Sequence, residues 1–103
     1  MKRGEVWWAD LPLPIGRRPV ILLSRDEAYS VRSAVTVAEI TKTIRNIPVE
    51  VPLGQKDGLA KSCVANLDTI VTIQKKLLTE RICLLKEEKI RQINAAIKFA
   101  LDL

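Results

Sequence analysis

Apolar and polar residues alternate over several short stretches of this chain, which is the pattern of half-buried β-strands. The strands that this pattern predicts cover residues 5–10, 20–23, 34–41, 47–53, 63–66, 69–73 and 81–84, with 63–66 and 69–73 forming one bent strand or two. Residues 75–80 are predicted to be a connection. Pro48 and Pro52 cannot donate to a β-ladder, so their strand belongs at a sheet edge. Short strands at such close spacing predict a small, strongly curved antiparallel sheet or barrel.

Near the C-terminus the apolar spacing changes to the three- and four-residue steps of a helix. The side chains that share one helical face are Ile90, Ile93, Ile97, Ala100 and Leu101. They predict an amphipathic helix over residues 87–101, although Lys86 is a poor N-terminal cap. Ser24 and Glu27 have the spacing of a capping box, which predicts a short helical turn over residues 25–30. The expected fold is therefore α+β, in a single domain of residues 1–103.

The most apolar run of the chain, Val20–Leu23, follows directly after Arg17, Arg18 and Pro19. A proline disfavours the helical region for the residue before it, so Arg18 should be extended and should lead into a buried strand. A guanidinium at the end of such a strand can bind a phosphate through two parallel hydrogen bonds. The alternative is an ordinary strand with a solvated basic end, and this stretch by itself favours the alternative.

Composition adds a net charge of +5, from 17 Lys and Arg against 12 Asp and Glu in 103 residues, which favours a polyanionic partner such as nucleic acid. The chain has no histidine. The commonest general acid/base, the Ser-His triads and the usual zinc ligands are therefore excluded, and neither a metal nor another cofactor is expected. Cys63 and Cys83 lack metal-ligand spacing, and no signal or membrane-spanning run is visible, so a cytoplasmic protein with reduced thiols is expected.

Alternation within the predicted strands assigns faces to several side chains. Trp7 and Trp8 are neighbours, so one should lie in the core and the other should face solvent, a partner subunit or a ligand such as an RNA base. In residues 34–41 the side chains on one side are Val35, Val37, Glu39 and Thr41.

Several blocks of sequence follow one another in a particular order. They are residues 3–11 (RGEVWWADL), 16–24 (GRRPVILLS), 40–41 (IT), 72–73 (TI) and 96–101 (AIKFAL). No single block is specific, but the ordered set resembles the MazF/PemK family of toxins from bacterial toxin-antitoxin pairs. The resemblance implies an SH3-like antiparallel β-barrel with a C-terminal helix. It also implies a sequence-specific, metal-independent endoribonuclease that cuts single-stranded RNA through 2′-hydroxyl attack and that a cognate antitoxin inhibits.

The same resemblance implies which residues form the site. The arginine before the proline and the threonine after the third strand are catalytic in the family, and they correspond to Arg18 and Thr41. The expected RNA-binding residues are Trp8, Arg17, Ser24, Lys42, Thr43 and Thr69. Because a guanidinium stays charged in proteins, Arg18 is expected to bind phosphate and stabilise the transition state rather than move protons.

A homodimer is expected both from the family and from the surplus of apolar side chains. Burying both tryptophans and the helix face leaves little room in one small chain for Val35, Val37, Ile70 and Ile73. A two-fold dimer would bury this surplus.

The sequence departs from the family pattern at particular places. The loop over residues 11–17 is short and lacks the Gly-Ser-Glu stretch of many relatives, Cys63 stands where serine is common, and Thr69 stands where glutamine is frequent. The RNA target or the activity can therefore differ. Two alternatives stay open, since fold alone does not determine function. One is a non-catalytic toxin or binding module that acts on a protein target such as DNA gyrase, and the other is an inactive nuclease that binds RNA or an antitoxin.

Overall fold

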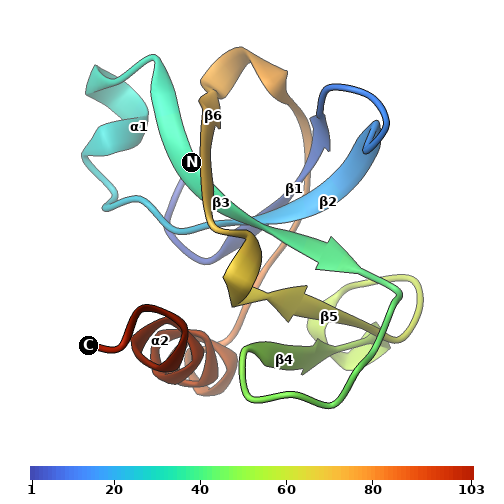
Figure 1. The fold of residues 1–103 in the computed structure, drawn as a ribbon. Coiled ribbons are helices and arrows are strands. Elements are labelled where there is room, and N and C mark those ends of the chain that lie inside the picture. The colour runs from blue at the N-terminus through green and yellow to red at the C-terminus, as the bar shows by residue number, and fades with distance from the viewer.

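The computed structural model describes residues 1–103 as a seven-stranded antiparallel sheet with a C-terminal helix (Figure 1). The strands are β1 (Glu5–Asp10), β2 (Arg17–Leu22), β3 (Ala34–Thr41), β4 (Glu50–Leu53), β5 (Cys63–Asn66), β6 (Val71–Gln74) and β7 (Leu78–Leu84). The helices are α1 (Ala28–Val31) and α2 (Glu87–Leu101). The predicted α+β class is confirmed. No helix is long and apolar enough to cross a membrane.

Strand β3 is the centre of the sheet because it pairs with three other strands. Its first half pairs with β6, its middle with β2, and its end, Ile40 and Thr41, with β5. The remaining order is β4-β5-β3-β2-β1-β7, so β4 is an edge strand, as Pro52 predicts, while Pro48 lies in the turn before it. Since β4 and β7 end this order without pairing with each other, the sheet is strongly curved but is not closed into a barrel.

Curvature gives the sheet an apolar core on each face of β3. The first core is a cluster that contains Ala38 and Ile40 together with Ile93 of α2. The second core is a cluster that contains Val35 and Val37 together with Val20 and Leu22 of β2 and with Ile73. Ile70 packs against the first cluster. The expectation that Val35, Val37, Ile70 and Ile73 lack room in one chain is therefore wrong, because a curved sheet with a core on each face takes up apolar side chains on both sides.

Helix α2 begins and ends at the predicted residues. Ile93 and Ala96 are buried, and Ile90, Ile97 and Ala100 pack against the first cluster, whereas Leu101 in the last turn is 54% exposed. Lys86 makes no side-chain capping bond, and Glu87 and Glu88 place negative charge at the positive end of the helix.

Several boundaries differ from the predictions. Strand β2 begins at Arg17 rather than residue 20, β4 at Glu50 rather than residue 47, and β6 at Val71 rather than residue 69. No capping box forms at α1, because the Ser24 Oγ accepts a hydrogen bond from the backbone N–H of Thr36 at 2.8 Å and so ties its loop to β3. Strand β7 begins at Leu78 instead of residue 81, because Leu78 and Glu80 pair with β1 although Thr79 and Glu80 carry no strand pattern. Residues 63–74 form two strands, separated by a 3₁₀ turn at Leu67–Thr69.

Candidate active site

A groove opens where β3 leaves β2. The register of these strands pairs Val20 with Glu39, so continuing it by two residues would place Arg18 opposite Thr41. The β2–β3 pairing stops at Val20 and Glu39, however, and the end of β3 stays paired only along its other edge, where Thr41 is opposite Val64 of β5. The beginning of β2 and the end of β3 therefore diverge, as Figure 1 shows, and both Arg18 and Thr41 line the space between them.

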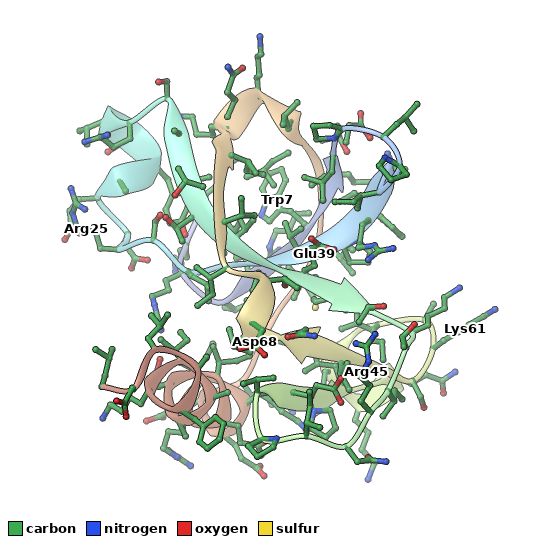
Figure 2. The ribbon with its side chains drawn as sticks, in the orientation of Figure 1. Trp7, Arg25, Glu39, Arg45, Lys61 and Asp68 are labelled. Carbon is green, nitrogen blue, oxygen red and sulfur yellow. The ribbon has the colours of Figure 1, made fainter.

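The groove has a volume of about 920 Å³ and an apolar base with cationic sides. Its lining residues include buried Ile40, Leu59 and Cys63 together with the cations Arg17, Arg18, Lys42 and Lys61. None of the residues that line it is acidic. Such a surface attracts an anion while offering apolar area to the rings that the anion carries. Figure 2 shows Lys61, one of these cations, at the right-hand edge of the molecule, with Glu39 nearer the centre.

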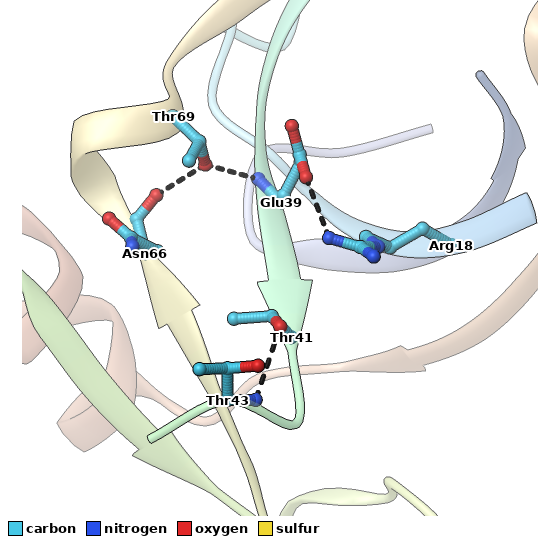
Figure 3. Close-up of polar contacts among 6 residues, drawn as sticks. All are labelled: Arg18, Glu39, Thr41, Thr43, Asn66 and Thr69. Carbon is cyan, nitrogen blue, oxygen red and sulfur yellow. Dashed lines mark hydrogen bonds and ion pairs between the residues drawn. The ribbon is translucent and has the colours of Figure 1, made fainter. Parts of the chain in front are cut away.

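Arg18 is held from one side by a carboxylate that the sequence predictions did not include in the site. Its Nη1 lies 3.0 Å from the Oε1 of Glu39, and the two side chains are 35% and 16% exposed (Figure 3). The backbone N–H of Glu39 donates to the Oγ1 of Thr69 at 3.0 Å, and that hydroxyl donates to the carbonyl of Asn66 at 2.6 Å. The sequence carried one signal for this contact, because alternation along residues 34–41 places Glu39 on the same side as Val35, Val37 and Thr41.

Thr41 organises the turn that follows β3. Its Oγ1 accepts the backbone N–H of Thr43 at 3.2 Å (Figure 3), which places Lys42 and Thr43 at the groove. Because the oxygen is used as an acceptor there, the hydroxyl proton of Thr41 remains available to an anion in the groove. Arg18 and Thr41 thus offer a cationic donor and a neutral donor to one space.

The two tryptophans lie on opposite faces of β1, as predicted. Trp7 packs against the second core, and its Nε1 donates to the Oε1 of Glu5 at 3.0 Å. Trp8 lines the groove, and the guanidinium carbon of Arg17 lies 4.8 Å from the centroid of its ring. This contact is a cation–π interaction that leaves an aromatic and a cation side by side at the groove.

The predicted site residues thus divide into two groups. Those that line the groove are Trp8, Arg17, Arg18, Thr41, Lys42 and Thr43. Ser24 and Thr69 do not line it, since Ser24 bonds to β3 and Thr69 supports the backbone of Glu39. Cys63 does line it, but burial and the nearby Asp57 raise the pKa of its thiol, which makes it a poor nucleophile at neutral pH. The chain has no group of three or more His, Cys, Asp or Glu side chains arranged to hold a metal ion.

Comparison with known proteins agrees with this architecture. The probable endoribonuclease MazF5 of Mycobacterium tuberculosis is 38% identical over 101 residues, which are 97% of this chain and 92% of that protein. The solved structure of the Mycobacterium tuberculosis toxin MazF-mt6 superposes with a TM-score of 0.89 at 32% identity, over 96% of this chain and 97% of that one. A mycobacterial endoribonuclease solved in complex with its cognate antitoxin has a TM-score of 0.88 at 29% identity, over 100% of this chain and 96% of that one.

The family match covers nearly the whole chain and therefore includes both strands that form the groove. It spans residues 2–101, from the segment before β1 to the last residue of α2. The fold, the groove and the sequence agree, and the chain belongs to the family of PemK-like, MazF-like toxins of type II toxin-antitoxin systems.

Proposed function

We propose that this protein, an endoribonuclease of the MazF family, cleaves single-stranded RNA at specific sequences without a metal ion. The observation that carries the proposal is the convergence of Arg18 and Thr41 on one groove that is lined by cations and by no carboxylate. Phosphodiester cleavage needs donors aimed at a phosphate, and these two side chains supply them from diverging strands. Arg17, Lys42 and Thr43 extend the polar surface along which the RNA backbone runs, and Trp8 provides a ring on which a base stacks.

The proposed reaction uses the RNA's own 2′-hydroxyl. Its oxygen attacks the adjacent phosphorus and loses its proton, the bond to the 5′-oxygen breaks, and that oxygen leaves with a proton, which produces a 2′,3′-cyclic phosphate and a free 5′-hydroxyl. The charge on the pentacoordinate phosphorus is greatest at the transition state. Arg18 stays charged throughout and stabilises that charge together with the hydroxyl of Thr41.

The partners follow from the same surface. An antitoxin that is acidic and partly disordered can place a carboxylate on Arg18, where the RNA phosphate would otherwise bind, and so inhibit by competition. A mycobacterial endoribonuclease of similar fold was solved in complex with its cognate antitoxin, which supports an antitoxin as a partner. The toxin acts as a homodimer in the cytoplasm, where its RNA substrates are found.

The test is to incubate the purified protein with a long RNA in excess EDTA. We expect discrete fragments at a restricted set of sequences, and no cleavage by Arg18→Ala. Arg18→Lys should remain poor, because an ammonium keeps the charge without the two-pronged geometry. Arg91→Ala is the matched control, since Arg91 is an exposed arginine of α2 paired only with Glu87. Intact RNA, or cleavage that depends on an added divalent metal, would contradict the proposal.

A further inference from the structure

We propose that Glu39 is a positioning residue for Arg18. It holds the Nη1 edge of the guanidinium so that the donors on Nε and Nη2 are presented to the RNA phosphate. This role rests on the proposed nuclease function, and it is argued from the contacts that Glu39 makes in this chain. It begins with the 3.0 Å ion pair between the Nη1 of Arg18 and the Oε1 of Glu39, in which no other nitrogen of Arg18 takes part.

Glu39 is fixed from both sides of its strand. It pairs with Val20 of β2, and its neighbours Ala38 and Ile40 are buried in the first core. Its backbone N–H is satisfied by Thr69, whose hydroxyl is in turn anchored on the carbonyl of Asn66. With its backbone fixed in this way and its side chain only 16% exposed, the Glu39 carboxylate has few other positions to occupy, which restricts the nitrogen bonded to it.

The contrast with Arg17 shows that this is not a general property of the arginines at the groove. Arg17 lies 3.8 Å from Asp10 and 3.7 Å from Glu80, and both of those carboxylates are largely exposed, at 58% and 70%. Arg18 has one short contact to a carboxylate that is only 16% exposed. Exposed pairs exchange with water, whereas a half-buried pair with a fixed acceptor keeps one orientation.

Orientation matters because arginine has a long side chain with several rotatable bonds. A reacting group misplaced by about 1 Å can reduce a rate roughly 100-fold, and supporting contacts that fix the rotamer prevent that loss. The carboxylate also places a negative charge near the anion that Arg18 binds. Removing Glu39 should therefore weaken catalysis without weakening RNA binding, which distinguishes positioning from a simple contribution to affinity.

The test uses wild type, Glu39→Ala and Glu39→Gln with a short RNA that contains a cleavage site mapped for the wild type. Single-turnover rates at saturating protein are compared with the Kd for the same RNA carrying a 2′-deoxy nucleotide at the cut site. We expect Glu39→Ala to lose about 10- to 100-fold in rate with an unchanged or lower Kd. Glu39→Gln should recover most of the rate, since its amide oxygen still accepts from Nη1. The shape of the pH–rate profile should be the same in wild type and Glu39→Gln.

Glu80→Gln is the matched control, because it removes one negative charge beside the other groove arginine and should leave the rate unchanged. Circular dichroism melting confirms that each variant is folded. A Glu39→Ala rate equal to that of the wild type would overturn the inference. A higher rate would also overturn it, because it would show that Glu39 competes with phosphate for Arg18. Loss of the acid limb of the pH profile in Glu39→Gln would overturn it by making Glu39 a general base. Wild type that leaves the RNA intact would overturn the nuclease function itself, whereas full activity in Glu39→Ala contradicts the positioning role alone.

Discussion

Two threonines with the same chemistry have different surroundings in the folded protein. Thr41 lines the groove and accepts a hydrogen bond from Thr43, two residues away. Thr69 lies outside the groove and bonds to the backbone of Glu39, 30 residues away in sequence. A hydroxyl can donate and accept in many directions, so its partners depend on what the fold brings near it. The contact with Glu39 makes Thr69 a support of the site in this chain.

At this scale we predict the effect of Thr41→Val, which keeps the shape of the side chain and removes the hydroxyl. Loss of one preorganised donor to a developing oxyanion costs about 3 kcal/mol, or a rate loss of roughly 100-fold or more. Single-turnover RNA cleavage measures this loss, and the melting temperature should change little because the freed N–H of Thr43 is reached by water. Thr36→Val is the control, since Thr36 pairs with Thr72 on the exposed surface. Equal activity of the two variants would show that Thr41 is only a strand residue.

At the scale of elements, one aromatic side chain packs α1 against the sheet. Tyr29 is buried in the second core, and its hydroxyl donates to the carbonyl of Ser24 at 3.1 Å. Burial raises the pKa of Tyr29 from its ordinary value of 10.0 to about 12. The folded state therefore retains a proton that the unfolded chain has already lost between these two values.

We predict that stability is constant with respect to this group below pH 10 and falls as the pH rises toward 12. Urea unfolding at a series of pH values measures the decline. In Tyr29→Phe this contribution to the alkaline decline should disappear, at a cost of about 1 kcal/mol near neutral pH from the lost hydrogen bond. An identical alkaline slope in both proteins would show that another group is responsible.

Helix α2 is the other element whose attachment can be measured directly. Ile93 is 0% exposed in the first core, so Ile93→Ala should reduce the free energy of unfolding by about 2–5 kcal/mol. Phe99 lies on the same helix but is 62% exposed, and Phe99→Ala should change stability by less than about 0.5 kcal/mol in the free monomer. Guanidinium denaturation measures the free energy of unfolding of both variants. Comparable losses would place Phe99 in an interface with another copy of the chain.

At the scale of the whole molecule, an interface between two copies of the chain would have to use other apolar side chains than those from which the dimer was predicted. Of the apolar residues that seemed too many for one chain, Val35, Val37 and Ile73 are buried within it and Ile70 is partly buried. Large apolar side chains that remain exposed include Leu13, Val71, Leu84, Phe99, Leu101 and Leu103. We predict that light scattering at micromolar concentration gives twice the 11.6 kDa mass of one chain. A mass of one chain at that concentration would contradict the dimer.

Local patterns determined much of this protein. The three- and four-residue apolar spacing predicted both ends of α2, because a helix depends on contacts between residues close in sequence. The apolar run after Pro19 predicted a buried strand, and Val20, Ile21 and Leu22 are 0% exposed. Ordered sequence blocks indicated the family, and with it the proposed roles of Arg18 and Thr41.

Only the tertiary structure decided which side chains meet. β7 begins at Leu78 because β1 pairs with it, and Ser24 bonds to β3 because the chain returns beside it. The groove exists because the pairing of β2 with β3 stops at Val20 and Glu39 while β3 continues beside β5 on its other edge, and the Glu39 carboxylate reaches Arg18 across 21 residues of sequence on the shared face of β2 and β3. Pairings of this kind depend on sheet register and curvature, which no local pattern of residues encodes.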